Sequence, residues 1–304
     1  MNVKQICERV WKYASDRNFR FLVNADMGMY KNMDDAAYLK KKFECKMGMP
    51  LNLENPKTFN EKLQWLKLND RDPSHTMMVD KYEVKEYVAA TLGREYIIPT
   101  LGVWDKFEDI DFDKLPDQFV LKCTHDSGGL VIVRDKAKLD VEAARKKINK
   151  CLKKNYFYVG REWPYKDVKP RIIAEKLMVD DSGTGLRDYK VLCFEGEPKL
   201  IEYHLGRFTS ERYQDFYDTQ WNKTDIVQVG EKISPFNTPK PELLDQMMEK
   251  TCTLAKGLHH VRIDWYISGG QLYFGEITFF DASGFDAFED IKNDELLGSW
   301  ITVI

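Results

Sequence analysis

Two carboxylates and an arginine in residues 261–284 have types and spacing that suit a metal site. The segment VRIDWYISGGQLYFGEITFFDASG alternates apolar and polar residues on both sides of a turn at 268–270, which predicts two short strands. With a three-residue loop, Arg262 lies opposite Glu276, and Asp264 lies diagonally from Glu276 on the same face, about 7 Å away or less. Neighbouring carboxylates repel each other unless a cation joins them. Mg²⁺ takes one or two carboxylates and completes its shell with phosphate oxygens; an ordinary surface ion network is the alternative interpretation.

A lysine and a glycine-bearing loop further upstream have the composition of a phosphate site. Residues 118–135, QFVLKCTHDSGGLVIVRD, read as two apolar strands with Lys122 at the end of the first. Its ammonium follows three apolar residues and is costly to desolvate without an anion nearby. The small residues Ser127, Gly128 and Gly129 let backbone N–H groups approach a phosphate closely. The segment has no Walker motif, and a plain hairpin loop with an edge lysine is the alternative.

A third segment has the features of a nucleotide-edge contact. Residues 171–178, RIIAEKLM, read as a buried strand that runs out into a connecting segment, where free backbone groups can bond the edge of an adenine. Glu175 then accepts from the exocyclic amine, and Asp180 or Asp181 in the following loop is available to a ribose. Lys190, in the hairpin that comes next, alternates outward like a second lysine that faces phosphate.

Composition excludes several classes of protein. The 304 residues include 46 basic and 49 acidic side chains, so the net charge of −3 gives no overall attraction to nucleic acid. Six cysteines are scattered without a CxxC pair, which is typical of reduced thiols. No apolar run approaches the roughly 20 residues of a membrane span, and no signal-peptide pattern opens the chain. We therefore expect a cytoplasmic protein.

The supporting elements are mostly helices in the first half of the chain. Residues 1–22 read as one basic amphipathic helix, for which docking on the body of the protein is favoured over an anionic membrane surface. A second helix is predicted over 34–46. Thr58 and Glu61 have capping-box spacing at the start of a third. A further amphipathic helix over 242–257 leads into the hairpin described first.

The order of these parts resembles the ATP-grasp enzymes. RIDWY…LYFGEITFFDASG looks like the arginine, aspartate and Glu-x-Asn signature of the D-alanine–D-alanine ligases, and AEKLM looks like their adenine-contacting segment. More closely, the chain resembles the teichuronopeptide-biosynthesis type of ATP-grasp protein in the strings NPKTFNEKLQWLKL, DKYEVKEYV, FVLKCTHDSGG, DYKVLCFEGEPKLI and FGEITFFDASG. Members of that group occur in capsule and exopolysaccharide gene clusters and are often labelled glycosyltransferases. The resemblance runs from about Leu51 to Phe285.

The resemblance implies an α+β fold in which two subdomains with antiparallel sheets grip ATP. A helical N-terminal region over 1–50 and an N-terminal subdomain over 51–117 would precede them. The nucleotide clamp would then occupy 118–180, and the C-terminal subdomain with the metal hairpin 181–304.

The resemblance also assigns roles to the residues singled out above, with ATP and Mg²⁺ as cofactors. Lys122 and Lys190 would bind the phosphates of ATP, and Arg262 would hold the transferred phosphate or the acyl phosphate. Asp264 and Glu276 would bind magnesium, together with Thr278, which stands where the ligases have an asparagine ligand. The remaining contacts to the nucleotide are assigned to Ser127, Gly128, Gly129, Glu175, Lys176, Leu177, Met178 and Asp181.

The implied function is an ATP-dependent carboxylate–amine ligase that works through an acyl phosphate. Its substrates would be a sugar acid or amino acid, or a precursor of a cell-surface polysaccharide. A glycosyltransferase, a sugar kinase and a nucleotide-binding scaffold are the alternatives; the short Asp-x-Asp of a glycosyltransferase occurs only at 111–113, where a turn is the favoured interpretation. Residues 1–22 leave open a peripheral contact with the inner face of the cell membrane.

Overall fold

Two antiparallel β-sheets form the framework of the computed structural model, which describes residues 3–126, 128–179, 186–206 and 212–303. One sheet has the order β1-β4-β2-β3 and comprises β1 (Thr100–Trp104), β2 (Phe119–Cys123), β3 (Leu130–Val133) and β4 (Ile172–Lys176). The other has the order β7-β6-β5-β8-β9 and comprises β5 (Tyr189–Phe194), β6 (Glu197–Leu205), β7 (Tyr213–Tyr217), β8 (His260–Ser268) and β9 (Gln271–Thr278). The expected α+β fold with two antiparallel sheets is confirmed.

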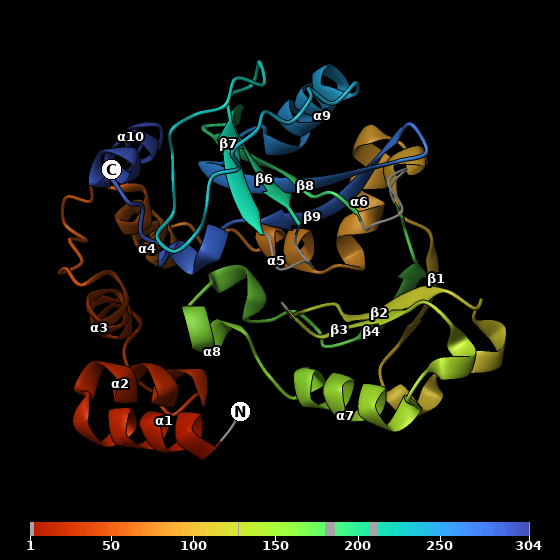
Figure 1. Ribbon diagram of the computed structural model, residues 1–304, viewed down its shortest axis with the longest axis horizontal. Coiled ribbons are helices and arrows are strands. Elements are labelled where there is room, and N and C mark those ends of the chain that lie inside the picture. Colours follow the sequence, from red (N-terminus) through yellow and green to blue (C-terminus); the bar gives the residue numbers. More distant parts are fainter. Residues whose placement is uncertain (1–2, 127, 180–185, 207–211, 304) are drawn as a thin grey trace.

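Ten α-helices in the described part of the chain surround the sheets. They are α1 (Val3–Ser15), α2 (Arg17–Asp26), α3 (Asp35–Met47), α4 (Phe59–Asn69), α5 (Ser74–Val79), α6 (Glu83–Leu92), α7 (Val141–Leu152), α8 (Phe157–Gly160), α9 (Leu244–Ala255) and α10 (Ile291–Ser299). In Figure 1 the five-stranded sheet lies above the four-stranded one, with α9 above the former and α7 below the latter.

Side-chain caps decide where several of these helices begin. The capping box predicted at Thr58 and Glu61 is present at the start of α4. Asp34 caps α3, where its side chain accepts a hydrogen bond from the backbone N–H of Ala37. The single helix predicted over 1–22 is wrong, because Asp16 accepts hydrogen bonds from the backbone N–H groups of the first turn of α2 and so starts a second helix there.

The five-stranded sheet has one apolar and one polar face. Ile263 and Trp265 of β8 are fully buried in the large core. The indole N–H of Trp265 donates to Thr251 of α9 at 2.7 Å, which fixes α9 on this face. Because side chains alternate along a strand, the residues between them point to the other side of the sheet, toward the four-stranded sheet.

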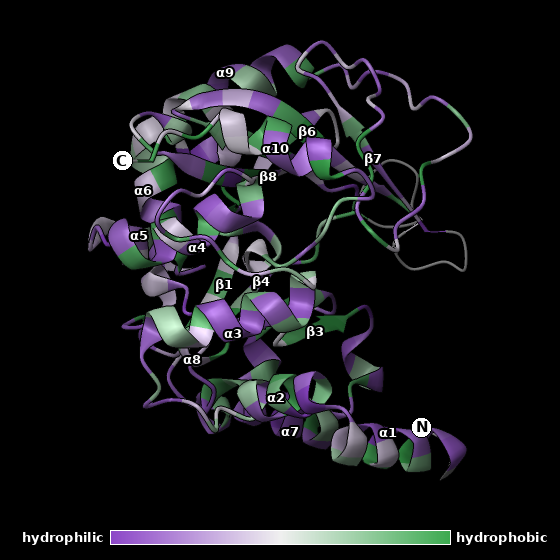
Figure 2. Cartoon of the chain, turned by 90° about the vertical axis from the view of Figure 1, so that its left-hand side faces the viewer, coloured by the Kyte–Doolittle hydropathy of each residue, from purple (hydrophilic) through white to green (hydrophobic). Residues whose placement is uncertain are grey.

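Helix α1 does not dock on the body of the protein as the sequence favoured. Ile6, Val10 and Trp11 are 45%, 64% and 72% exposed. The hydroxyl of Tyr13 donates to Asn24 at 2.8 Å, which ties α1 to α2. Figure 2 shows α1 projecting at the lower edge of the molecule. Within the described residues, no helix combines the length and the apolar character needed to cross a bilayer.

The boundary drawn at residue 117 divides elements that share a sheet. β1 lies before that boundary, yet it pairs antiparallel with β4, as Val103 opposite Ile173 shows. β4 in turn pairs with β2, where Leu121 lies opposite Ala174. The four-stranded sheet therefore draws on both sides of the boundary.

His260 makes the stability of the large core depend on pH. Its ring is 2% exposed and lies 4.9 Å and 4.8 Å from the rings of Phe59 and Phe194. Burial lowers its pKa from 6.5 to about 3. The unfolded chain then binds a proton that the folded protein does not, so the free energy of unfolding falls by up to about 1.4 kcal/mol per pH unit below the unfolded pKa.

When the pH is lowered from about 7 to about 5, we expect the melting temperature of His260→Phe to fall less than that of the wild type. The substitution removes the titrating ring but keeps an aromatic side chain. Thermal unfolding followed by circular dichroism measures this difference. His259→Gln is the matched control, since His259 is exposed and should keep the wild-type pH dependence. Parallel pH dependence in His260→Phe and the wild type would contradict the assignment.

Candidate active site

The hairpin of β8 and β9 turns on two residues, 269–270, and not on the three predicted. Both are glycines with positive φ, at +56° and +70°, as a tight two-residue hairpin turn requires. The predicted register is therefore wrong: Arg262 lies opposite Thr278, not Glu276. Asp264 lies directly opposite Glu276, where a diagonal placement was expected.

A β-bulge at Gly275 keeps the two carboxylates on one face. A two-residue turn alone would pair Asp264 with Gly275 and send Glu276 to the other face. The register shifts by one residue at this point, so Glu276 takes the position opposite Asp264. A Cβ atom at Gly275 would lie 2.9 Å from the backbone oxygen of Asp264 and 2.8 Å from the ring of Tyr266. The bulge therefore requires glycine.

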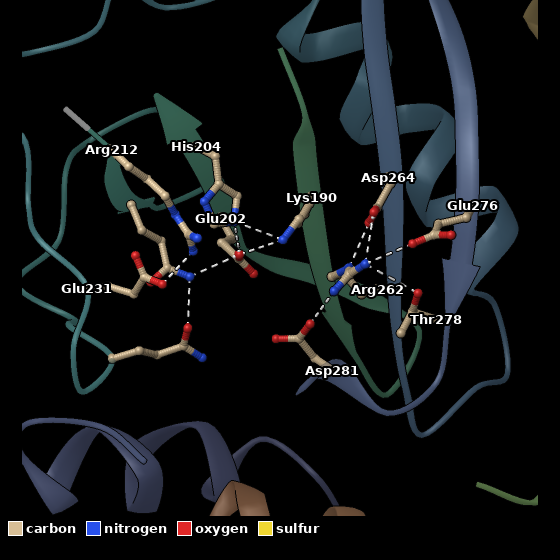
Figure 3. A network of polar contacts seen from close by, with 12 residues as sticks. Lys190, Glu202, His204, Arg212, Glu231, Arg262, Asp264, Glu276, Thr278 and Asp281 are labelled. Atoms are coloured by element: carbon tan, nitrogen blue, oxygen red, sulfur yellow. Dashed lines mark hydrogen bonds and ion pairs between the residues drawn. The ribbon is translucent and has the colours of Figure 1, made fainter. Parts of the chain in front are cut away.

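One register row carries four charged side chains across four strands. Glu202 of β6 lies opposite Lys190 of β5, Lys190 lies opposite Asp264, and Asp264 lies opposite Glu276. The ammonium of Lys190 lies 2.7 Å from the carboxylate of Glu202. Figure 3 shows this row on the polar face of the sheet. The structure thus brings three of the predicted site residues together and adds Glu202 to them.

Arg262 holds the carboxylates of the hairpin together. Its guanidinium donates to both oxygens of Asp264, at 2.7 Å and 2.9 Å, and to Glu276 at 3.2 Å. It also donates to the hydroxyl of Thr278 at 3.3 Å and pairs with Asp281 beyond the end of β9 (Figure 3). Although burial opposes its charge, Asp264, Asp281 and Glu202 raise the pKa of Arg262 well above its usual value.

The two facing carboxylates differ in acidity. Burial, with the charge of Glu276, raises the pKa of Asp264 to about 7, against the opposing effect of Arg262. Burial also disfavours the charge of Glu276, but Lys81 and Arg262 lower its pKa to about 2. The ammonium of Lys81 lies 3.1 Å from Glu276. Glu276 therefore has Lys81 as a close partner, whereas Asp264 is held by the guanidinium that it shares with Glu276.

The donor set of the hairpin fits magnesium. Asp264, Glu276 and Thr278 offer hard oxygen ligands on one face, and all three lie around a single cationic group, the guanidinium. In the described part of the chain no three histidine, cysteine, aspartate or glutamate side chains gather as a metal cluster. A metal ion here would therefore need ligands from a bound phosphate as well, which is how Mg²⁺ is usually held.

Lys122 lies in a buried ion cluster on the four-stranded sheet. Its ammonium is 2.6 Å from Glu175 of β4, and Lys85 of α6 pairs with the other oxygen of the same carboxylate. Burial would raise the pKa of Glu175, but Lys122 and then Lys85 lower it to about 2. The sequence predicted that Glu175 accepts a hydrogen bond from adenine. In the structure both oxygens of its carboxylate are paired with ammonium groups instead.

A pocket between the two sheets contains most of the residues predicted around the nucleotide. Lys122 and Glu175 stand at its polar side, and the segment from Lys176 to Met178 lines it next to them. The other lining residues are mainly apolar and come from both sheets: Ile98, Val120, Leu130, Ile132, Arg134, Leu186, Asp188 and Tyr266. An apolar slot with a few charged groups at one side suits a nucleotide base next to its phosphates.

The glycine loop has a different environment from the one predicted. Gly128 has a φ of +108° with open space around it, and it lines a separate groove. A Cβ atom at Gly129 would lie 3.0 Å from that of Cys151, so this glycine serves the packing of the loop on α7. The predictions for Ser127 and Asp181 fall outside the described residues.

Sequence reasoning missed five charged or titratable residues of the site: Lys81, Lys85, Glu202, His204 and Asp281. His204 pairs with Glu202 beside Lys190, whose ammonium is 2.9 Å from the imidazole. Lys81 and Lys85 belong to the string DKYEVKEYV, which carried part of the family resemblance but received no role. Two lysines four residues apart at the start of a helix were the signal that could have identified them.

Two antiparallel sheets whose charged residues face the space between them are the arrangement expected of an ATP-grasp enzyme. The family model described as TupA-like ATPgrasp matches residues 61–302. The chain therefore belongs to the TupA-like ATP-grasp family, and the expectation of an ATP-grasp enzyme is confirmed. No curated protein matches the chain.

Several solved structures resemble the chain at low similarity. D-alanine–D-alanine ligase from Bacillus anthracis, complexed with ATP, is 18% identical with a TM-score of 0.39, and the match covers 67% of this chain and 55% of that one. The Helicobacter pylori ligase is 15% identical with a TM-score of 0.39, over 80% of this chain and 69% of that one. The ATP-grasp ligase PsnB, complexed with a minimal precursor, Mg and ADP, is 11% identical with a TM-score of 0.38, over 84% and 65%. These likenesses are too distant to support a conclusion about this site.

We expect Gly275→Ala to lower the free energy of unfolding by about 1–3 kcal/mol, because the added methyl group overpacks the bulge against β8. The same strain should reduce the rise in melting temperature produced by ATP with Mg²⁺. Urea unfolding and differential scanning fluorimetry measure the two effects. Gly269→Asn is the control, since nothing lies within 4 Å of a Cβ there and asparagine tolerates positive φ.

Proposed function

We propose that the protein is an ATP-dependent carboxylate–amine ligase that forms an amide through an acyl phosphate. The observation that carries this proposal is the row of Glu202, Lys190, Asp264 and Glu276, which faces the pocket-bearing sheet with Arg262 alongside. This row combines carboxylates that suit magnesium with cations that suit phosphates. Membership of the ATP-grasp family supports the same activity.

The chemistry proposed has two steps. A substrate carboxylate oxygen attacks the γ-phosphorus of ATP, the bond to the β-phosphate oxygen breaks, and ADP leaves. The amine of the second substrate then attacks the acyl carbon, loses a proton, and expels inorganic phosphate. Both steps develop negative charge on phosphoryl oxygens, so fixed positive charge lowers the barriers.

The chain supplies that positive charge from several elements. Lys122, Lys190 and Lys81 are each held in place by a buried or half-buried carboxylate. Arg262 is fixed by its carboxylates and is assigned to the transferred phosphoryl group. Magnesium held by Asp264 and its neighbours would supply further positive charge to the phosphates of ATP.

The proposed substrates are a sugar acid or amino acid and an amine, joined on a cell-surface polysaccharide or its precursor. Resemblance to the teichuronopeptide-biosynthesis group supports this choice. The glycosyltransferase alternative has no comparable support: Asp111 accepts from the backbone N–H of Asp113 and pairs with Lys114 at 2.9 Å. Its carboxylate therefore caps a short turn, as the sequence favoured.

Product analysis separates the reactions open to this site. The protein is incubated with ATP, Mg²⁺, and uronic acids and amino acids, singly and in pairs. ADP and phosphate released only when carboxylate and amine are both present, together with an amide product in the mass spectrum, support the ligase. ADP with a phosphorylated sugar would identify a kinase. UDP or GDP released from a nucleotide sugar, with no turnover of ATP, would overturn the proposal.

We expect Asp264→Asn and Glu276→Gln to abolish ATP-dependent release of ADP, because each removes a carboxylate proposed to bind magnesium. Their effects on stability should differ. Asp264 is already destabilised as an anion, so its amide should cost little, whereas Glu276→Gln loses an anion that Lys81 and Arg262 stabilise. Coupled-enzyme assays and urea unfolding measure the two effects.

The control for these two variants is Glu197→Gln, an exposed carboxylate on β6 of the same sheet. It should keep both turnover and stability. A surface ion network without a metal role predicts instead that both variants retain turnover, and that Asp264→Asn loses stability as Glu276→Gln does.

We expect Lys122→Ala to weaken ATP binding by about 10-fold or more, since a charged hydrogen bond to phosphate contributes roughly 1.5–3 kcal/mol. Glu175 keeps Lys85 as a partner, so the fold should survive. Isothermal titration with ATP and Mg²⁺ measures the affinity. Lys199→Ala, at an exposed position on β6, is the control. Wild-type affinity in Lys122→Ala would reduce this lysine to a structural role.

A further inference from the structure

The N-terminal helices leave a group of large apolar side chains in contact with solvent. Ile6, Val10 and Trp11 of α1 are exposed, as are Met27 and Met29 just after α2, at 61% and 63%. Helical spacing places Val10 between Ile6 and Trp11 on one side of α1, away from Lys12. We call these five residues the N-terminal apolar surface. Large exposed apolar groups on neighbouring helices mark a site of interaction.

A basic groove borders this surface. It is lined by Met27 and by five exposed lysines from two segments, Lys31 after α2 and Lys147, Lys150, Lys153 and Lys154 in and just after α7. Asp26 and Asp126 also line the groove. Within the described residues, none of the five lysines has a carboxylate at ion-pairing distance; Lys147, for example, donates to the backbone oxygen of Leu130 at 2.5 Å. The groove therefore carries a clear excess of positive charge.

This end of the molecule differs from the rest in charge. The whole chain has a net charge of −3. Residues 1–22 contain five lysines or arginines against two carboxylates, and residues 141–154 contain six against one. In Figures 1 and 2, α1, α2 and α7 lie at the same lower end of the molecule. Apolar side chains and excess lysines are thus concentrated together at one end of an otherwise acidic protein.

We propose that this end docks on an anionic lipid bilayer. The apolar side of α1 enters the interface between headgroups and acyl chains, where tryptophan is favoured, and the lysines of the groove contact the anionic headgroups. Charge complementarity selects this partner, because a purely apolar partner would leave the lysines unpaired. Gly128 lines the same groove, so the docked surface borders the loop between β2 and β3. The docking does not depend on the ligase activity.

The test is flotation of the full-length protein with lipid vesicles. Vesicles of phosphatidylcholine alone are compared with vesicles that contain about a quarter phosphatidylglycerol, in about 0.1 M and about 0.5 M NaCl. We expect binding to the anionic vesicles at the lower salt concentration, and loss of most of it at the higher one. No binding to either vesicle, or equal binding to both, would overturn the proposal.

Two sets of substitutions separate the apolar and the basic contributions. Val10→Ser with Trp11→Ser should weaken vesicle binding on the order of 10-fold or more, by loss of buried apolar area. Lys150→Gln, Lys153→Gln and Lys154→Gln together should weaken it on the order of 100-fold, at about a factor of five for each charge. These positions are exposed, so the fold should be retained, and circular dichroism and the melting temperature check this.

The matched control removes three exposed lysines elsewhere, with Lys57→Gln, Lys199→Gln and Lys256→Gln together. Wild-type vesicle binding is expected from this control, and a loss equal to that of the groove variant would overturn the assignment to this end. Light scattering without lipid tests a second copy of the chain as the occupant. A dimer that Val10→Ser with Trp11→Ser abolishes would assign the apolar surface to self-association and overturn the bilayer proposal.

Discussion

The structure depends most on how three carboxylates, two of them buried and one half-buried, can stand in one register row on one face of a sheet. Glu202, Asp264 and Glu276 occupy one register row with Lys190 between the first two. Like charges at such spacing destabilise a sheet, and burial increases the cost. Cations from outside the row offset this repulsion. Arg262, from the neighbouring row of β8, pairs with Asp264, and Lys81, from the segment before α6, pairs with Glu276. The positive groups that suit phosphate are therefore the same groups that make the row stable.

The segment before and within α6 connects the two sheets at this site. The backbone N–H of Lys81 donates to Thr124, at the end of β2, at 3.0 Å, while its ammonium reaches Glu276 on the other sheet. One turn further on, Lys85 shares Glu175 with Lys122. Lys81 and Lys85 therefore place one ammonium group on a carboxylate of each sheet.

The sequence allowed correct prediction of what depends on neighbours along the chain. The capping box at Thr58, the β2–β3 hairpin around Lys122 and the alternation in β8 all follow from local patterns. The register of β8 and β9 does not follow from local patterns. The two-residue turn is one residue shorter than predicted, and the bulge at Gly275 adds one residue to β9, so the two changes offset each other. The two carboxylates therefore share a face for a reason that alternation does not reveal. Glu202 was missed although its partners Lys190 and His204 lie in the same hairpin, because the register that places Glu202 opposite Lys190 was not predicted.

The two facing carboxylates show why the site is suited to a ligand that brings its own cation. Glu276 is satisfied as an anion by Lys81 and Arg262, so its pKa is low. Asp264 shares the guanidinium with Glu276 and Asp281, and its pKa is high because burial and a neighbouring charge outweigh that share. The cations near Asp264 therefore do not fully offset its burial and the charge of Glu276. A divalent cation added beside Asp264 would be attracted by both carboxylates, because it would favour the ionised form of Asp264. ATP with Mg²⁺ brings such a cation.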